Sequence, residues 1–444
     1  MTLLNQKRVA FCTFGCRLNQ YDTEAMRTLL EREGEFRTVG FREEADIYVV
    51  NTCSVTARAD ATARKTIRRL ANEHPDAQIV VSGCYAQRAS EEIAALPGVS
   101  LVLGAANRGA IAAEVRLSPP GAQRIVVAPV QEATKFLEVP ITEMMDRSRA
   151  FVKVQEGCDE SCSFCIVPQT RGRSRSRDPE RVISQVHELV ESGYSEVVLT
   201  GVHVGEFGAD LGNGQRLLPA LIEQILAIPG VLRFRLSSIE PSTITQDVID
   251  LMAAEPRFAN HFHIPFQSGS NEVLARMQRR YTVEMFEDIV ERINAAVPGF
   301  GFGTDVICGF PGESDAEFQQ TFDCLERWPI TYIHPFTYSI RPGSEAERFS
   351  DQVDGDVKKR RTRALKRLSS DKTMAFRQNY LGRETEVMIE RAERSGETVI
   401  GGLTDTYLRV DLPHAPRDAD GLRVVQVTGV SEQALVGELV QPKG

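Results

Sequence analysis

The chain has 444 residues, which is long enough for two to four domains. Its hydrophobic content of 42% and charged content of 25% are ordinary for a globular protein. The net charge of −9 argues against a general nucleic-acid binder, so any such contact has to come from a local basic patch. The N-terminal segment lacks a signal-peptide pattern, and no apolar run reaches about 18 residues, so we expect a cytoplasmic protein without membrane contact.

The first 118 residues alternate strand-like and helix-like patterns. This order is typical of an α/β domain built on a parallel sheet. The predicted strands are 8–13, 46–51, 78–82 and 100–103, and the predicted helices are 20–33 and 57–73.

Three of the nine cysteines, Cys16, Cys53 and Cys84, stand at or just past the ends of the first three strands. Those ends share one edge of a parallel sheet, where ligands bind. Three thiolates there could hold an iron–sulfur cluster with one iron open. The alternative is three unrelated buried thiols, since free cysteine is often buried. Cys12 lies inside the first strand and is expected in the core.

The stretch 119–149 begins with a Pro-Pro-Gly break and has little periodicity. We predict a linker with a possible strand at 124–127. The predicted division is therefore 1–118, this linker, 150–380 and 381–444.

From residue 150 to about 350, six strand-like runs each have a helix-like partner. Repeated βα units of this length predict an open (β/α)6 barrel with its functional residues at the C-terminal strand ends. The runs are 150–155, 196–201, 233–238, 261–266, 301–309 and 332–339.

Cys158, Cys162 and Cys165 follow the first of these strands within eight residues. A [4Fe–4S] cluster normally takes four thiolates, so three leave one iron open to coordinate a small molecule. This pattern indicates a catalytic cluster. A zinc site would want a second Cys or His pair nearby, and His187, the nearest downstream histidine, lies in a helical pattern.

This spacing resembles that of the radical SAM superfamily. With the N-terminal cysteines, the chain resembles the methylthiotransferases, which combine a three-cysteine domain, a radical SAM barrel and a C-terminal TRAM domain. The resemblance implies that the open iron chelates S-adenosylmethionine and that an electron from the cluster releases a 5′-deoxyadenosyl radical. It also implies a second [4Fe–4S] cluster on Cys16, Cys53 and Cys84 that supplies or carries sulfur. An electron donor of flavodoxin or ferredoxin type and a sulfur source would be partners.

Glycine-containing loops end the barrel strands, where a backbone can approach a ligand closely. By resemblance this face binds S-adenosylmethionine, with ordinary turn chemistry as the alternative. Gly201 is expected near its methionine moiety, Gln267 and Ser268 near the ribose or carboxylate, and Gly309 and Gly312 near the adenine. The complete predicted set is Gly201, Ser238, Glu240, Gln267, Ser268, Asp305, Gly309 and Gly312. Cys308 and Cys324 are expected to be packed thiols.

Arg171, Arg173, Arg175 and Arg177 follow the cysteine loop. At period two their guanidiniums would face one side of an extended segment, which suits phosphate contact. The alternative is a solvated run that makes salt bridges. A helical pattern at 357–380 carries seven Lys or Arg between positions 358 and 367 and is a second candidate for RNA contact, or else a solvated face.

Five short strand-like runs close the chain, at 386–389, 399–403, 407–411, 423–428 and 434–440. They predict a small β-barrel of OB type, which resembles a TRAM domain. Residues 383–444 hold eleven Asp or Glu against seven Lys or Arg, a balance of −4. A barrel that grips RNA would normally be basic, so a few residues such as Arg391, Arg394 and Arg409 would have to do so.

The segment 15–21, Gly-Cys-Arg-Leu-Asn-Gln-Tyr, resembles the MtaB branch of the family, and Arg17 would be able to pair with a substrate carboxylate. That branch implies methylthiolation at C2 of N6-threonylcarbamoyladenosine beside the tRNA anticodon, with the base splayed out of its loop. Alternatives within the family are isopentenyladenosine in tRNA and an aspartate of a ribosomal protein. An alternative of another class is an iron–sulfur electron carrier or RNA-binding scaffold. Asn19 and Asn51 flank two cysteines and would orient loops, or serve only as turn and capping residues.

Overall fold

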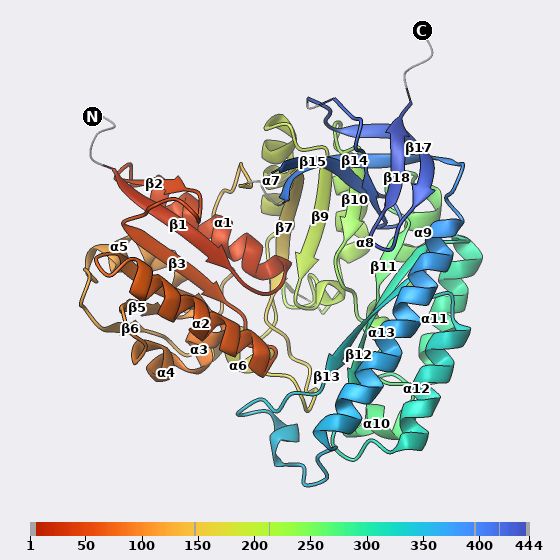
Figure 1. Cartoon of the computed structure of the whole chain (residues 1–444), viewed down its shortest axis with the longest axis horizontal. Coiled ribbons are helices and arrows are strands. Elements are labelled where there is room, and N and C mark those ends of the chain that lie inside the picture. The colour runs from red at the N-terminus through yellow and green to blue at the C-terminus, as the bar shows by residue number, and fades with distance from the viewer. Residues whose placement is uncertain (1–5, 146–147, 213, 395–396, 417, 441–444) are drawn as a thin grey trace.

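The computed structural model describes residues 6–145, 148–212, 214–394, 397–416 and 418–440. It contains an N-terminal α/β domain, a central barrel of strands wrapped by helices, and a small C-terminal β-barrel above the central one (Figure 1). The predicted α/β fold class and its three parts are confirmed. None of the described helices is long and apolar enough to cross a membrane.

The N-terminal domain is a six-stranded parallel sheet in the order β2-β1-β3-β4-β5-β6. Its strands are β1 (Lys7–Thr13), β2 (Phe36–Val39), β3 (Ile47–Thr52), β4 (Gln78–Gly83), β5 (Val99–Leu103) and β6 (Arg124–Val126). Its helices are α1 (Arg17–Glu31), α2 (Ala57–Glu73), α3 (Cys84–Arg88), α4 (Ser90–Ala94) and α5 (Ile111–Arg116), with a 3-10 turn at Ala105–Ala110. All four predicted strands and both predicted helices are present.

Two edge strands were not part of the predicted sheet. β2 is short and half-exposed, so its apolar pattern is weak. β6 lies in the segment predicted as a linker, and it pairs in parallel with β5. The N-terminal sheet therefore continues past residue 118.

The central barrel contains the six predicted strands, in the order β7-β9-β10-β11-β12-β13, and the isolated bridges Phe234↔Phe258 and Ser238↔His263 join its two sheets. The strands are β7 (Arg149–Glu156), β9 (Glu196–Gly201), β10 (Arg233–Leu236), β11 (His261–His263), β12 (Gly301–Cys308) and β13 (Tyr332–Thr337), and β8 (Arg175–Ser176) pairs antiparallel with β7. Its helices are α6 (Val167–Arg171), α7 (Pro179–Glu191), α8 (Leu218–Leu226), α9 (Gln246–Ala254), α10 (Asn271–Arg276), α11 (Val283–Ala296), α12 (Asp315–Arg327) and α13 (Gly355–Gln378). Short 3-10 turns lie at Val130–Glu132, Val204–Glu206, Pro241–Thr243 and Glu345–Arg348.

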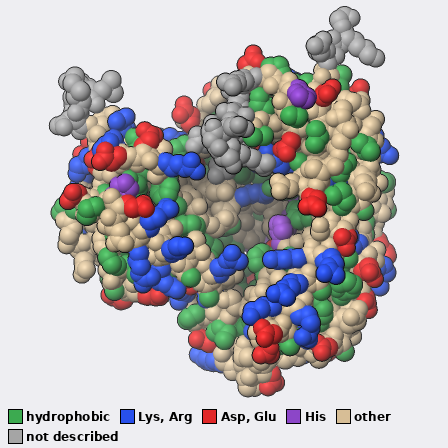
Figure 2. Space-filling view, in the orientation of Figure 1, with side chains coloured by type: hydrophobic (Ala, Val, Ile, Leu, Met, Phe, Trp, Pro, Cys, Tyr) green, Lys and Arg blue, Asp and Glu red, His purple; other side chains and the backbone are tan. Residues whose placement is uncertain are grey.

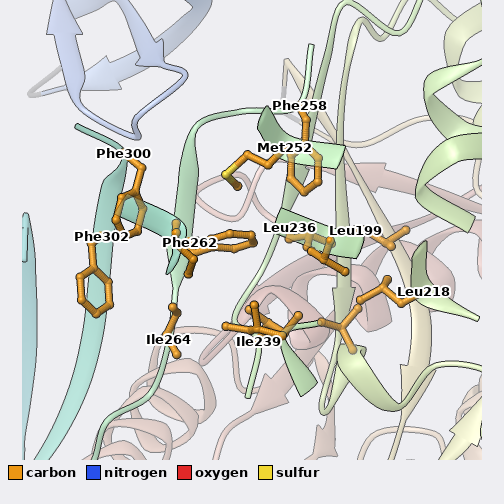
Figure 3. Close-up of a cluster of buried hydrophobic side chains, with 14 of the residues drawn as sticks. Leu199, Leu218, Leu236, Ile239, Met252, Phe258, Phe262, Ile264, Phe300 and Phe302 are labelled. Atoms are coloured by element: carbon orange, nitrogen blue, oxygen red, sulfur yellow. The ribbon is translucent and has the colours of Figure 1, made fainter. Parts of the chain in front are cut away.

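Alternate residues of these strands face opposite sides, as strand geometry requires. One set packs against the helices in the largest apolar core, where Leu199, Leu236, Phe262 and Phe302 lie on successive strands (Figure 3). The other set faces the barrel interior and is mostly polar or charged. It includes Lys153, Gln155, Glu196, Thr200, Arg233, Arg235, His261, His263, Asp305, Tyr332 and His334. A polar interior is suited to a ligand.

Helix α1 covers the inner side of β7 and β9 beside the opening of the barrel (Figure 1). Tyr21 and Ala25 of α1 pack with Phe151 and Val198 in one apolar cluster. The Tyr21 hydroxyl also donates to Gln185 of α7 at 3.3 Å. The N-terminal domain is therefore docked on the barrel through its first helix.

The C-terminal part is a closed barrel in the order β14-β15-β16-β18-β17, and all five predicted strands are present. They are β14 (Glu384–Arg394), β15 (Glu397–Thr404), β16 (Arg409–Asp411), β17 (Leu422–Val430) and β18 (Leu435–Leu439). Arg235 of β10 donates to the carbonyl oxygens of Thr404 and Asp405 at 3.0 and 2.8 Å. The turn after β15 thus sits against the ends of the central strands.

Candidate active site

The loop after β7 carries Cys158, Cys162 and Cys165, which we call the first cysteine set. Hydrogen bonds to backbone carbonyls fasten this loop to the barrel. Gly157 has a φ of 75°, which favours glycine, and a side chain there would collide with the Arg173 carbonyl. Ser163 donates from its backbone to the Met277 carbonyl at 3.1 Å and from its hydroxyl to the Arg276 carbonyl at 2.8 Å. The three thiols are therefore presented by a fixed loop.

Each sulfur of this set has a hydrogen-bond donor. The Glu160 amide points at Cys158 Sγ and the Val167 amide at Cys165 Sγ, both at 3.4 Å. Arg279 Nη1 lies 3.1 Å from Cys162 Sγ. Donors aimed at sulfur stabilise thiolates, which are the form that binds metal.

Burial raises the pKa of Cys158 and of Cys165 to about 12, so the free thiols keep their protons near neutral pH. A bound metal removes those protons. Three thiols in one short loop, each with a donor aimed at its sulfur, fit a cluster held by three thiolates.

The second cysteine set lies at the carboxyl ends of three adjacent strands. Cys16 precedes α1, Cys53 follows β3 and Cys84 begins α3. Burial raises the pKa of Cys53 to about 12, and the neighbouring sulfurs of Cys84 and Cys16 add to the effect. The sheet thus brings together three thiols from positions far apart in the sequence.

Two glycines make room for this set. A Cβ on Gly15 would lie 2.7 Å from the Cys53 Cβ, and one on Gly83 would collide with the Thr52 backbone. Both have positive φ, 105° and 97°. Asn19 donates to the carbonyls of Phe14 and Thr52 at 2.7 and 3.1 Å, so it ties two cysteine loops together.

A buried charge network lies beneath the second set, between the two domains. Asp22 of α1 accepts from Arg108 at 2.6 Å, from Lys153 at 2.6 Å and from Arg171 at 3.0 Å. Glu156 accepts from the same three cations at 2.6, 3.1 and 2.8 Å. Three cations therefore face two carboxylates, and all five side chains are buried.

Arg171 also belongs to the cysteine site. Burial would lower its pKa, but Cys84, Asp22, Glu156 and Cys16 outweigh burial and raise it well above the usual value. Its guanidinium donates to Asn19 Oδ1 at 2.6 Å. A permanent cation thus lies beside the thiols.

The prediction that four arginines face one side of an extended segment is wrong. Residues 167–171 form α6, and Gly172 turns the chain with a φ of 77°, so the period of two is broken. Arg171, Arg175 and Arg177 are buried, and Arg177 pairs with Glu138 at 2.8 Å. Of the four, Arg173 has an exposed side chain, at 80%, and it lies 3.6 Å from the exposed carboxylate of Asp159.

A cavity of about 200 Å³ is lined by residues that belong to, or lie close in sequence to, each of the two cysteine sets. Val55 and Thr56, just after Cys53, line one side, and Cys165 lines another. Gln267 and Asp305 line it from the barrel. A molecule in this cavity contacts the surroundings of both sets at once.

The structure separates the predicted S-adenosylmethionine residues into two groups. Gln267 and Asp305 line the cavity, and Glu240 pairs with Arg279, the residue that donates to Cys162. Gly201 lies against Gln155, and Ser238 bridges to β11.

The other three predicted residues lie elsewhere. Ser268 is fully buried, and its hydroxyl meets that of Thr321 on α12 at 3.3 Å. Gly309 packs under Lys358 of α13, and the exposed Gly312 donates to the Asp351 carbonyl. These positions support the loops around the cavity and do not line it.

Several site residues carry no motif that sequence reasoning used. Arg279 stands in an Arg-Arg-Tyr segment far from the cysteines, and Tyr407 lies in a turn of the C-terminal barrel. Tyr407 has a φ of 70°, unusual for a side chain of this size. Lys153 offered a signal, since a lysine at an apolar strand's alternate position indicates a polar barrel interior.

Comparisons with known proteins agree with this geometry. The Radical SAM superfamily matches residues 152–325, and a family described as Uncharacterized protein family UPF0004 matches residues 8–104. The structure of the radical S-adenosylmethionine methyltransferase TsrM from Kitasatospora setae shares the fold, with a TM-score of 0.57 at 15% identity over 88% of this chain and 79% of that one. The barrel and its cysteine loop define a radical SAM enzyme, which uses S-adenosylmethionine and a [4Fe–4S] cluster.

Curated relatives indicate which family of radical SAM enzymes the chain belongs to. The chain is 42% identical over 405 residues to the threonylcarbamoyladenosine tRNA methylthiotransferase MtaB of Bacillus subtilis (strain 168), covering 90% of this chain and 89% of the relative. It is 33% identical over 407 residues to the tRNA-2-methylthio-N(6)-dimethylallyladenosine synthase of Carboxydothermus hydrogenoformans, covering 90% and 92%. The chain belongs to the radical SAM tRNA methylthiotransferase family.

Proposed function

We propose that this enzyme methylthiolates C2 of N6-threonylcarbamoyladenosine beside the anticodon of tRNA. The observation that carries the proposal is the cavity that Cys165 lines on one side and that Val55 and Thr56, which follow Cys53, line on another. An adenine held there lies between the site where hydrogen is abstracted and the site from which sulfur is delivered. The similarity to relatives named for threonylcarbamoyladenosine supports the choice of substrate.

We propose Cys16, Cys53 and Cys84 as ligands of a second [4Fe–4S] cluster, and Cys158, Cys162 and Cys165 as ligands of the cluster that cleaves S-adenosylmethionine. When bound, these groups supply the radical and the sulfur. The protein orients them through the amides of Glu160 and Val167 and through the Arg171 side chain. An external electron donor and a sulfur source complete the reaction.

Basic surface around the central hollow supports a tRNA partner. Figure 2 shows Lys and Arg side chains gathered on both sides of the hollow, over α2 and α13. Arg58, Lys65, Arg68 and Arg69 on α2 are exposed, as are Lys359, Arg360, Arg363, Lys366 and Arg367 on α13. Arg361 is not available, because it is buried against Glu313 at 2.6 Å. Salt-dependent binding is expected of such a surface.

The acidic C-terminal barrel contributes less to that surface. Arg409 pairs with Asp411 at 2.8 Å, and the side chains of Arg391 and Arg394 lie outside the described part of the chain. We propose that the main role of the C-terminal barrel is to cover one end of the central barrel.

Isopentenyladenosine is the second candidate substrate, because relatives at 32–33% identity are named for the dimethylallyl base. The test uses the reconstituted enzyme, dithionite, sulfide, S-adenosylmethionine and total tRNA that lacks methylthio groups. Nucleoside mass spectrometry is expected to show one methylthio group added to threonylcarbamoyladenosine. A gain confined to isopentenyladenosine would overturn the substrate, and cleavage of S-adenosylmethionine without any tRNA product would overturn tRNA methylthiolation itself.

A further inference from the structure

The far end of the barrel interior contains a group of stacked aromatic and charged side chains that comes from all three parts of the molecule. Arg17 is the first residue of α1, next to Cys16. Tyr407 comes from the turn after β15, and His261 stacks on its ring with 4.7 Å between centroids. Figure 2 shows a histidine and basic side chains inside the central hollow.

A series of further side-chain contacts connects this group with the cavity. Tyr332 Oη lies 2.9 Å from His261 Nε2 and 3.2 Å from His263 Nδ1. His263 Nε2 lies 2.9 Å from Asp305 Oδ1, and His334 Nδ1 lies 3.4 Å from the same oxygen. Asp305 in turn lines the cavity beside Cys165.

Among the described side chains at this end, Arg17 is a cation that has no ion-pair partner. Arg235 is paired with Glu196 at 3.1 Å, and Asp305 takes both histidines. Arg17 donates to the Tyr407 hydroxyl at 2.5 Å and lies over its ring, 5.4 Å from the centroid. Among the residues that the structure describes, no carboxylate lies within ion-pair distance of Arg17. A half-buried guanidinium of this kind is suited to binding an anionic group.

The C-terminal barrel is built to bring Tyr407 to this position. Its φ of 70° is a strained conformation for tyrosine, which persists only where surrounding contacts enforce it. Arg17 and Arg235 lie on its ring, and Gly301 of β12 leaves the space that Thr406 occupies. Burial alone would raise the pKa of Tyr407. The cations Arg17, Arg149 and Arg235 outweigh burial and lower the pKa of Tyr407. Strain held by so many contacts is typical of a functional position.

We infer that Arg17, Tyr407 and His334 form a binding site for the carboxylate and hydroxyl of the substituent on the adenine N6 atom. This inference rests on the proposed function and adds the residues that select the substrate. An apolar isopentenyl group would bury these polar side chains without partners, which costs binding free energy. The C-terminal barrel then acts as a wall of the active site as well as an RNA contact.

The test compares two anticodon stem-loop RNAs, one with threonylcarbamoyladenosine and one with its threonine carboxylate blocked as the methyl ester. Binding is measured by fluorescence anisotropy, and methylthiolation by mass spectrometry. The unaltered enzyme should favour the acid over the ester by about tenfold to a hundredfold, the range of a charge-assisted hydrogen bond. Arg17→Met should lose that preference, while Arg17→Lys should keep part of it.

Arg32→Met is the matched control, because Arg32 is exposed at the opposite end of α1. Tyr407→Phe removes only the hydroxyl that orients Arg17 and should reduce the preference without lowering the iron content. An unchanged acid-to-ester ratio in both Arg17→Met and Tyr407→Phe would overturn the binding site while leaving the proposed function intact. If the unaltered enzyme acts on isopentenyladenosine and ignores threonylcarbamoyladenosine, the proposed function fails and the site fails with it.

Discussion

At the scale of single residues, side-chain burial divides the arginines of this chain by role. Arg171 and Arg173 are two positions apart, yet one side chain is 3% exposed and the other 80%. Sequence alone assigns both to phosphate contact. In the structure, Arg171 belongs to the buried charge network and to the cysteine site, whereas the side chain of Arg173 is exposed to solvent.

Arg171→Gln should therefore be costly. Removing the charge leaves Asp22 and Glu156 with two cations in place of three, and breaking a buried ion pair costs about 3 kcal/mol or more. Urea unfolding measures the loss. Arg173→Gln is the control and should stay within about 0.5 kcal/mol of the unaltered protein. Equal effects in the two variants would contradict the role of the network.

Arg279 is placed to adjust the cluster that we propose on Cys158, Cys162 and Cys165. Its guanidinium donates to Cys162 Sγ and pairs with Glu240. Because a cation and a hydrogen bond on sulfur favour the reduced, more negative cluster, Arg279→Met should lower the midpoint potential. A one-electron titration followed by EPR would show it, with about 59 mV for each tenfold change in equilibrium. A potential that stays the same or rises would argue against this role.

At the scale of elements, strand alternation explains most of what could be predicted. The inner and outer faces of β9 to β13 follow a period of two, so the sequence predicts all six barrel strands and places the cysteine loop at a strand end. The prediction that the four arginines face one side was wrong because one helical turn, α6, interrupts the period of two. The contact between Ser268 and Thr321 could not be predicted, because Thr321 lies on a helix 53 residues later in the chain.

Glycine substitution tests the second cysteine site at this scale. Gly15→Ala combines a φ of 105° with a Cβ that would lie 2.7 Å from Cys53. We expect the iron content to fall to about half, because the cluster that we propose on Cys16, Cys53 and Cys84 would be lost while the other is kept. Gly34→Ala also has a positive φ, 73°, but its Cβ meets nothing within 4 Å. It should lower stability by about 1 kcal/mol and keep all the iron. Iron loss in both variants would contradict the steric argument.

At the scale of the whole molecule, the charge network joins two domains that the sequence presents as separate. Its members come from positions 22, 108, 153, 156 and 171, and no local pattern relates them. Pairings between distant segments need the fold first. The relation of the two cysteine sets could be predicted only through family resemblance for the same reason.

This junction should weaken in acid. Burial and the nearby Glu156 would raise the pKa of Asp22. The cations Arg108, Lys153 and Arg171 outweigh both effects and lower the pKa of Asp22 below its usual value. The unfolded chain therefore binds more protons at mildly acidic pH, and the contribution of Asp22 is present above about pH 4 and is lost as pH falls further. Urea unfolding measured from about pH 6 down to about pH 3, which spans the titration of an ordinary carboxyl group, should show stability falling. Asp22→Asn should flatten that dependence, and an unchanged slope would exclude Asp22 as its source.

Helix α1 performs four tasks within two turns, and this limits how its sequence can change. Cys16 precedes it, Arg17 points to the C-terminal barrel, Tyr21 packs on β7, and Asp22 holds the buried cations. A single inserted residue would rotate everything after it by about 100°. Insertions and deletions in this stretch therefore cannot be absorbed by any one partner, and the spacing between Cys16 and Asp22 should be fixed in length even where its residues are free to vary.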